Sequence, residues 1–409
     1  MAAHATTYDI VIVGGGSAGC GVAASLLKRQ PQLNIGIIEP ASKHYYQPAW
    51  TLVGAGEFSA ANTERNMQDC IPHGAVWLQA AATSFDPSHN QVMTTMGVIT
   101  YHQLIVTAGL KLDWDAIVGL KETLGKNGVT SNYRFELAPY TWQLVQKLKS
   151  GTALFTQPPM PIKCAGAPQK AMYLSCSHWE QRGSLKYINV EFHIAGGVLF
   201  GVKDYVPALM QYIKRYNAHL NFASTLVEVD GTRRTATFQV KDADGNLIKI
   251  VRKFEMLHVV PPQTAPDFIK HSPLANADGW VDVHQHTLQH TRYDNIFSLG
   301  DVSSTPNAKT MAAARKQVVI AAENILAFRA GLPLPSRYDG YGSCPLTVEK
   351  GKVILAEFGY GGKLVPTFKW DSTKPRKSAW LLKKYLLPTV YWKLMLKGRE
   401  WLARCGACG

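Results

Sequence analysis

The sequence predicts an α/β protein with two Rossmann-like dinucleotide-binding domains, the first of them discontinuous, and a C-terminal amphipathic helical region that associates with a membrane. Three observations predict this architecture: a glycine-rich turn between an early strand and a helix, a second series of alternating strands and helices, and a late strand that returns the chain to the first domain. The expected first domain consists of residues 1–112 and 266–340, the second of residues 113–265, and the C-terminal region of residues 341–409.

Composition and charge exclude several classes of protein. The chain has 409 residues, of which 46% are hydrophobic and 18% charged, so it is globular and long enough for two or three domains. Its net charge of +14 favours an anionic partner, but no nucleic-acid-binding motif accompanies the charge, so we expect no nucleic acid. Seven scattered cysteines without a signal peptide argue against a secreted disulfide scaffold. The uncharged run at residues 10–27 is interrupted by glycines and is not a membrane span.

The N-terminal turn carries a complete dinucleotide fingerprint. A β-branched strand at residues 8–13 precedes GGGSAG, a helical stretch at residues 20–29 and a second strand at residues 34–38 that leads into Glu39. The helix N-terminus presents free N–H groups to phosphates, and Glu39 is expected to accept hydrogen bonds from the adenosine ribose. A glycine turn without a ligand is the alternative.

Each residue of this turn has a predicted role. Gly14 allows the tight turn, Gly16 lets the backbone approach a pyrophosphate, and Gly19 lets the helix lie close to the strand. Ser17 and Ala18, at the start of the helix, complete the expected contacts with the cofactor.

Two further strands favour FAD over NAD. Residues 295–301 form an apolar strand that ends in Gly300-Asp301, and residues 101–109 form another that ends in small residues up to Gly109. This arrangement resembles that of flavoproteins with two dinucleotide-binding domains. In those proteins the aspartate binds the ribityl chain of the flavin. We therefore expect FAD, with Gly109, Gly300 and Asp301 beside it.

The second domain lacks an intact nicotinamide turn. A strand is expected at residues 152–156, a helix at 167–181 and another strand at 188–194, after which a fingerprint is expected in an NADH-dependent protein. The sequence there is AGGVLFG, with bulky residues where a backbone would have to approach the cofactor. We infer that NADH is not the electron donor.

Cys164 is a candidate redox residue. It lies in the sequence PIKCAGAPQK, close to a helix N-terminus and between Lys163 and Lys170, and both features favour a thiolate. An inert buried cysteine is the alternative. The sequence predicts no metal site, and the terminal pair Cys405 and Cys408 is interpreted as incidental, with a redox pair or half of a zinc site as the alternatives.

Three segments together resemble the sulfide:quinone oxidoreductases. The similarity is strongest to the branch of that family that includes the mitochondrial enzyme. They are HYYQPAWTLVG at residues 44–54, KCAGAPQK at 163–170 and YDGYGSCPL at 338–346. The resemblance implies noncovalent FAD and a redox pair matching Cys164 and Cys344, which oxidises sulfide to a persulfide or polysulfide. Electrons pass to quinone, and the sulfur leaves to sulfite, glutathione, cyanide or sulfide.

The resemblance also assigns further residues. It implies FAD contacts, additional to those above, at Gln47, Ala82 and Lys309, a cation beside the flavin at Lys170, and an acid that moves protons at Glu122.

The C-terminal region is basic and rich in aromatic and apolar residues. We expect two helices divided by Pro388, lying in a membrane interface, with Phe358, Tyr391 and Trp392 near the quinone. An ordinary helical hairpin with solvated lysines is the alternative. The expected location is the cytoplasmic face of a bacterial inner membrane, or the mitochondrial inner membrane if a presequence has been removed, and a homo-oligomer is possible.

Two other activities fit the same fold. A quinone-linked NADH dehydrogenase would need a second intact glycine fingerprint. A cytochrome-linked sulfide dehydrogenase would be exported and would not need membrane helices.

Overall fold

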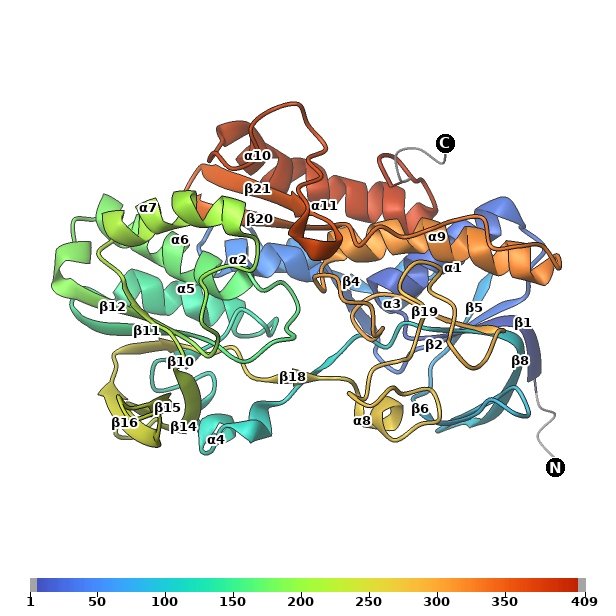
Figure 1. Cartoon of the computed structure of the whole chain (residues 1–409), viewed down its shortest axis with the longest axis horizontal. Coiled ribbons are helices and arrows are strands. Elements are labelled where there is room, and N and C mark those ends of the chain that lie inside the picture. Colours follow the sequence, from blue (N-terminus) through green and yellow to red (C-terminus); the bar gives the residue numbers. More distant parts are fainter. Residues whose placement is uncertain (1–5, 404–409) are drawn as a thin grey trace.

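A seven-stranded mixed sheet forms the first half of the computed structural model, which describes residues 6–403 (Figure 1). Its strand order is β5-β2-β1-β8-β7-β6, and β19 pairs with β8 on a side path. The strands are β1 (Thr6–Val13), β2 (Ile35–Ile38), β5 (Ala75–Leu78), β6 (Ala82–Asp86), β7 (Gln91–Thr94), β8 (Gly97–Val106) and β19 (Ile296–Ser298). The pairing of β19 with β8 confirms that the chain returns to its first sheet.

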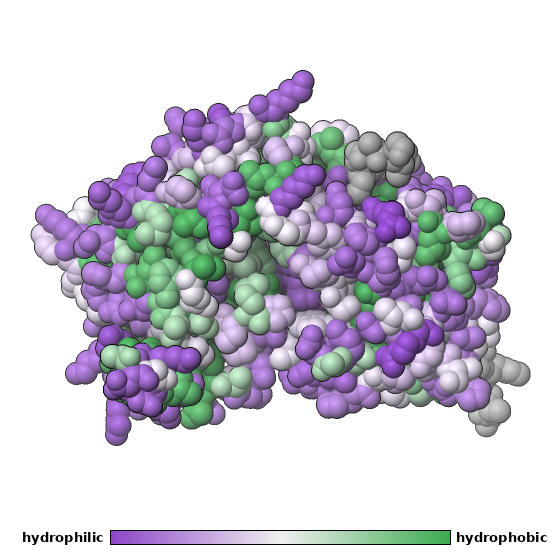
Figure 2. Space-filling view, in the orientation of Figure 1, coloured by the Kyte–Doolittle hydropathy of each residue, from purple (hydrophilic) through white to green (hydrophobic). Residues whose placement is uncertain are grey.

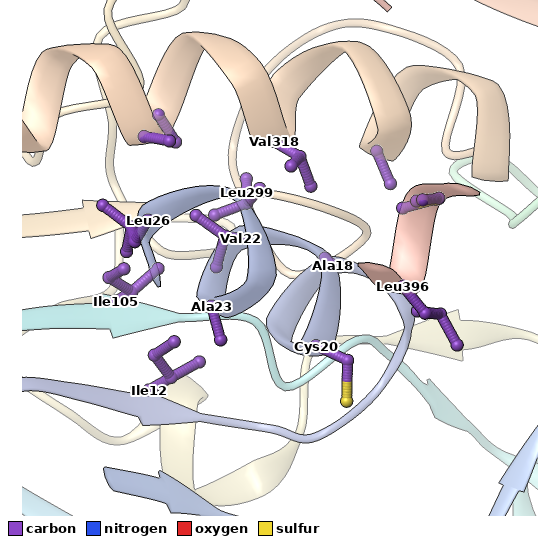
Figure 3. Close-up of a cluster of buried hydrophobic side chains, with 14 of the residues drawn as sticks. Ile12, Ala18, Cys20, Val22, Ala23, Leu26, Ile105, Leu299, Val318 and Leu396 are labelled. Atoms are coloured by element: carbon purple, nitrogen blue, oxygen red, sulfur yellow. The ribbon is translucent and has the colours of Figure 1, made fainter. Parts of the chain in front are cut away.

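Helix α1 (Ser17–Arg29) lies between this sheet and α9 (Met311–Arg329), as Figure 3 shows. Its small residues permit the close fit: Ala23 faces Ile12 of the sheet, and Val318 of α9 lies 3.1 Å from where a Cβ at Gly21 would be. Burial of this interface, and not helix propensity, accounts for the stability of such a glycine-containing helix.

A second sheet, entirely parallel, has the order β10-β17-β11-β12-β13. Helices α5 to α7 cover one face, where Figure 2 shows apolar side chains gathered left of centre, and an antiparallel sheet β14-β15-β16 lies below it (Figure 1). The elements are β10 (Val129–Thr130), α5 (Ala138–Lys147), β11 (Gly151–Gln157), α6 (Ala167–Gln181), β12 (Ile188–Ile194), α7 (Val206–Arg215), β13 (His219–Asn221), β14 (Thr225–Asp230), β15 (Thr235–Lys241), β16 (Leu247–Lys253) and β17 (Met256–His258).

Two chain segments join the halves as a short antiparallel pair, β9 (Lys111–Leu112) with β18 (Gln263–Thr264) (Figure 1). The remaining short elements are β3 (Lys43–Tyr45), α2 (Trp50–Val53), β4 (Glu64–Asn66), α3 (Met67–Cys70), α4 (Leu120–Thr123) and α8 (Asp267–Lys270). The domain boundaries given above stay predictions.

The C-terminal region begins with a hairpin of β20 (Gly342–Glu349) and β21 (Lys352–Phe358), followed by one continuous helical segment, residues 377–397. The expectation that Pro388 divides it into two helices was wrong. Pro388 follows a π-helical turn, Leu382–Leu386, and takes an early position in the next turn, so its missing N–H is accommodated without a break. No helix among residues 6–403 has the length and hydropathy needed to cross a bilayer.

Candidate active site

One cavity of about 450 Å³ runs from the N-terminal glycine turn to the second sheet and the C-terminal helical segment. That volume lies within the usual range for small-molecule sites. Its lining includes the predicted residues Gly14, Gly16, Ser17, Ala18, Glu39, Gln47, Gly109, Cys164, Lys170, Gly300, Asp301, Lys309 and Tyr391. Site residues that were predicted in separate parts of the chain therefore line one cavity.

The glycine turn has the geometry that a pyrophosphate requires. Gly14 has a φ of +106°, and a Cβ there would lie 2.6 Å from the Thr107 carbonyl oxygen. A Cβ at Gly19 would lie 1.9 Å from the Gly14 oxygen, so only glycine allows α1 to start this close to β1. Gly16 differs, because a Cβ there would meet no described atom within 4 Å. The space in front of Gly16 and the α1 N-terminus is thus open for phosphates.

Glu39 supports this turn as well as lining the cavity. Its Oε2 accepts a hydrogen bond from the Gly15 N–H at 2.8 Å, and its Oε1 accepts one from the Ala41 N–H at 2.8 Å. The carboxylate is therefore held at the end of β2, where the fingerprint expects a ribose.

The middle of the cavity carries buried charges. Lys309 Nζ donates to the carbonyl oxygens of Asp301 (2.7 Å) and Ser303 (3.0 Å). Burial lowers the pKa of Lys309 to about 8, with Asp301 partly opposing, and burial raises the pKa of Asp301. The Asn132 amide also lines the cavity, and both of its polar atoms lack a partner among the described residues. Open glycine surface and unpaired polar groups along one channel fit a bound dinucleotide.

Cys164 and Cys344 meet at the far end. Their Sγ atoms are 3.5 Å apart, and Lys170 Nζ, on the first turns of α6, donates to Cys164 Sγ at 3.1 Å. A hydrogen bond from Cys344, together with the charge of Lys170, outweighs burial and holds the pKa of Cys164 well below its usual range. The same hydrogen bond and burial raise the pKa of Cys344. These directions favour the negative charge on Cys164, beside Lys170, and the proton on Cys344.

The backbone around Cys164 is shaped for this contact. Cys164 has a φ of +52°, and its N–H donates to the Lys309 carbonyl at 2.8 Å, which ties the loop to the first sheet's part of the chain. A Cβ at Gly166 would lie 2.5 Å from Cys344 Sγ. Gly166 therefore makes room for the second thiol.

The structure does not bring every predicted residue to the cavity. Gln47 lines it and accepts a hydrogen bond from Lys163 Nζ. Ala82 starts β6 outside the lining, and Glu122 is exposed on α4, beside β14. Cys405 and Cys408 lie outside the described residues.

The predicted quinone contacts separate in a similar way. Tyr391 lines the cavity. Its hydroxyl is 2.8 Å from Ser17 Oγ and is hydrogen-bonded to His44 Nε2, so Tyr391 contacts the glycine turn. Phe358 stacks edge-to-face with Phe200, and Trp392 lies under Arg65; neither is in the lining.

Several lining residues were missed by sequence reasoning. Lys383 is buried in the π-helical turn, and Glu357 is buried on β21, where it accepts a hydrogen bond from the Tyr341 hydroxyl at 2.6 Å. A lysine within a basic helix carries no local signal of burial, and Glu357 lies on a strand whose residues 353–357 are all buried and otherwise apolar. Apolar residues missed on the same side are Leu355, Phe368, Leu382, Leu387 and Val390.

Sheet topology corrects the position predicted for a nicotinamide turn. In the first sheet β1 lies between β2 and β8, and in the second sheet β11 lies between β12 and β17, so β11 and α6 correspond to β1 and α1. The equivalent of the glycine turn is thus the loop 158–166, which carries Cys164, and not AGGVLFG after β12. In that later loop Leu199 and Phe200 are buried in the core, and no helix starts until η5 (Lys203–Tyr205) and α7.

Comparisons with known proteins agree with this fold. The protein-family model described as "Lycopene cyclase protein" matches residues 9–105, the part of the chain that forms most of the first sheet. The sulfide:quinone oxidoreductase structure from Aquifex aeolicus superposes with a TM-score of 0.77 at 19% identity, covering 97% of this chain and 92% of that one. The NDH2 structure from Plasmodium falciparum, in complex with NADH, gives 0.68 at 11% identity, covering 97% and 99%.

The fold is shared with these two structures, and the cavity defines a dinucleotide-binding α/β protein. The mitochondrial sulfide:quinone oxidoreductase of Dictyostelium discoideum is 44% identical over 95% of this chain and 86% of its own length, and that of Mus musculus is 39% identical over 96% and 87%. The chain belongs to the sulfide:quinone oxidoreductase family.

Proposed function

We propose that the chain oxidises sulfide and reduces a membrane quinone through FAD, with Cys164 and Cys344 carrying the sulfur chemistry. Family membership supports the two substrates. The observation that supports the cysteine assignment is the 3.5 Å contact between the two sulfurs, beside Lys170 and at the end of the cofactor cavity.

In the proposed oxidised state the two sulfurs are joined, directly or through one bridging sulfur. A disulfide bond is about 2 Å long and two consecutive S–S bonds span at most about 4 Å. The 3.5 Å separation of the thiols is close enough for either link to form with small movements.

The first step, for the direct link, is a thiol–disulfide exchange. Hydrosulfide attacks Cys344 Sγ, the Cys344–Cys164 S–S bond breaks, and its electron pair stays on Cys164 as a thiolate. Lys170 stabilises that thiolate through its 3.1 Å hydrogen bond, since the charged form of a buried sulfur needs a nearby cation. Cys344 then carries the sulfane sulfur as a persulfide, which a small nucleophile such as sulfite, glutathione, cyanide or a second sulfide removes.

When bound, FAD supplies a two-electron acceptor that quinone can reoxidise. Gly16 and the α1 N-terminus would hold its phosphates, Glu39 would hold its ribose, and Asp301 and Lys309 would hold the part nearest the thiols. Lys163 is half-buried in this region, where desolvation lowers its pKa. These residues orient the cofactor and exclude water from the site.

The quinone is assigned to the apolar arm of the cavity, between β21 and the C-terminal helical segment. Leu355, Leu382 and Val390 supply apolar walls, and Glu357 supplies a polar group of the kind that binds a carbonyl or a hydroxyl. Tyr391 stays a candidate contact from the same segment.

Membrane association is assigned to the outer face of that segment. Leu381 and Tyr385 are 56% and 60% exposed, and Lys377 and Lys393 are exposed on the same segment. Exposed apolar and aromatic residues next to lysines are typical of helices that lie in a membrane interface. A quinone could then reach the cavity without leaving the lipid.

The test is an anaerobic half-reaction. Sulfide should bleach the flavin of the purified protein, and a soluble quinone analogue should restore its colour. Cys164→Ser and Cys344→Ser should bind FAD but resist bleaching. Bleaching of either variant at the wild-type rate would contradict the cysteine assignment, whereas an unbleached wild-type protein would contradict the proposed function itself.

A further inference from the structure

Residues 390–402, which include the last turns of the C-terminal helical segment, lie against the start of helix α1. Figure 3 shows Leu396 beside Ala18, and Met395 Cε lies 3.2 Å from where a Cβ at Gly21 would be. We call residues 390–402 the C-terminal strap. Four of its side chains line the same cavity as the glycine turn, namely Tyr391, Met395, Trp401 and Leu402.

Tyr391 attaches the strap to the glycine turn. Burial lowers the pKa of His44 to about 4, so this ring is neutral and carries one proton. Its Nδ1 is 3.1 Å from the Gly15 carbonyl oxygen, which can only accept, so the proton is on Nδ1. Nε2 therefore accepts from the Tyr391 hydroxyl, and that hydroxyl accepts from Ser17 Oγ at 2.8 Å. One directed chain of hydrogen bonds thus joins the strap to the turn at which the phosphates are proposed to bind.

A second attachment lies outside the cavity. Glu400 Oε2 accepts a hydrogen bond from Arg29 Nη2 at 3.0 Å, and its Oε1 accepts one from Ser25 Oγ at 2.7 Å. The side chains of Arg29 and Glu400 are 21% and 11% exposed, so their ion pair is partly shielded from water. Gly398 permits this approach, because a Cβ there would lie 2.5 Å from the Ala24 carbonyl oxygen. The strap is therefore clamped to α1 by residues that do not line the cavity.

The end of the strap is a thin cover over the cavity. Arg315 of α9 lines the cavity and donates to the carbonyl oxygens of Trp401 (2.7 Å) and Leu402 (3.1 Å). Trp401 and Leu402 line the cavity as well, yet they are 51% and 46% exposed, so a single layer of residues separates this part of the cavity from water. Leu402 also has a φ of +54°, a left-handed conformation that is strained for leucine. The closed position of this end is thus held against a conformational cost.

We propose that the C-terminal strap retains FAD: the cofactor leaves only when residues 390–402 detach from α1, and bound FAD in turn stabilises the attached strap. The inference rests on the FAD site proposed above. The effect is reciprocal, because a ligand that is held more tightly by the closed arrangement shifts the equilibrium toward that arrangement. Arg29 and Glu400 are then positioning residues, which act through the strap on a cofactor that they do not touch.

The first experiment measures the release of FAD from the diluted holoprotein by the rise in flavin fluorescence. Glu400→Gln keeps the size of the side chain but removes its charge, and it should raise the FAD dissociation rate about tenfold, the equivalent of about 1.4 kcal/mol. Asp9→Asn is the matched control, since it breaks the Asp9–Arg329 ion pair, which joins β1 to α9 and has side chains 27% and 30% exposed. Its release rate should stay within about twofold of the wild type. A general loss of stability would affect both variants alike.

A measurement on the wild-type protein covers the case in which Glu400→Gln does not fold. Lys393, Lys397 and Arg399 are exposed on the strap, and trypsin cleaves after them only when the strap opens locally. Saturating FAD should slow cleavage at these sites at least about fivefold relative to the apoprotein, as mass spectrometry of the fragments measures. Cleavage after Arg233, which is exposed between β14 and β15, should not change and is the internal control.

The outcomes separate the role of the strap from the function on which it rests. Wild-type protein that binds no FAD would contradict the proposed function, and the inference with it. Release of FAD from Glu400→Gln at the wild-type rate, or an equal acceleration in Asp9→Asn, would overturn the role of the strap alone. Equal cleavage of the strap with and without FAD would overturn it as well.

Discussion

Two loops occupy the same position in the two parallel sheets, one between β1 and α1 and the other between β11 and α6. The first is the tight turn of residues 14–16, and the second is the longer loop of residues 158–166. Both end in a glycine immediately before a helix, Gly16 and Gly166.

The surroundings of these two glycines differ in a way that defines their uses. A Cβ at Gly16 would stand in open space, whereas a Cβ at Gly166 would lie 2.5 Å from Cys344 Sγ. The N-terminus of α1 therefore faces open space suited to phosphates, whereas the two thiols occupy the space in front of the N-terminus of α6. The second sheet thus keeps a dinucleotide-binding topology, while the loop between its β11 and α6 carries two thiols in place of a phosphate site.

The largest effect is expected at the thiols. Cys164→Ser or Cys344→Ser should lower sulfide-dependent quinone reduction by at least about a hundredfold, because serine cannot form the sulfur–sulfur bonds of the cycle. Steady-state assays with each variant measure this. Cys176→Ala, which removes a buried thiol of α6, is the control and should lower stability by about 1 kcal/mol with little change in turnover. Wild-type activity in either serine variant would contradict the assignment of thiol chemistry to the loop between β11 and α6.

The next largest effect is expected at Gly16. Its backbone conformation, with a φ of −72°, is accessible to any residue, and no atom of residues 6–403 outside its own chain neighbours and helix lies within 4 Å of an added Cβ. Gly16→Val should therefore fold with a stability within about 0.5 kcal/mol of the wild-type apoprotein. Its dissociation constant for FAD should rise by roughly a hundredfold, since the side chain occupies the phosphate space.

FAD titration of the apoprotein and thermal unfolding check this prediction together. Gly197→Val, at another glycine with open surroundings but in the exposed loop after β12, is the control and should bind FAD normally. Tight FAD binding by Gly16→Val would show that the phosphates lie elsewhere.

A smaller effect of the opposite kind is expected at Gly166. Its added methyl group would collide with Cys344 Sγ and with the Leu346 side chain, each at 2.5 Å. Gly166→Ala should retain FAD but slow flavin bleaching by sulfide about tenfold, because the sulfurs are pushed apart. Stopped-flow bleaching and FAD content, measured on the same sample, separate the two properties. If the variant binds less FAD but the flavin that remains bound bleaches at the wild-type rate, the assignment of the two loops is reversed.

The smallest effect, close to zero, is expected for NADH. The loop 158–166 presents Cys164 and no GxGxxG to a second dinucleotide, and the AGGVLFG loop precedes no adjacent α-helix. NADH added anaerobically should leave the flavin oxidised over the time in which sulfide bleaches it completely. Rapid bleaching by NADH would favour the quinone-linked NADH dehydrogenase alternative.

Local sequence predicted the first of these loops well and the second only in part. Residues 8–39 contain a complete strand, turn, helix and strand, so the fingerprint could be recognised without tertiary information. Cys164 was also found, from its lysines and its nearby helix. The topological equivalent of the glycine turn was placed after β12 instead of β11, because the order of strands depends on β17, about a hundred residues later.

The C-terminal region shows where sequence reasoning ends. Its basic and aromatic composition was evident, but Lys383 looked like every other lysine of the segment, and Pro388 looked like a helix break. Which lysine enters the cavity depends on the rotation of the helix at the π turn and on its packing against the hairpin β20–β21.

The sequence by itself determined the class of fold, the glycine turn, the acid at the end of β2 and the candidate thiol, because each depends on residues within one local segment. Only the tertiary structure decided that Cys344, 180 positions from Cys164, contacts the Cys164 sulfur, and that Lys383 lines the same cavity as Cys164. The physical reason is that contacts between distant segments depend on the packing of whole sheets and helices, which no short stretch of sequence encodes.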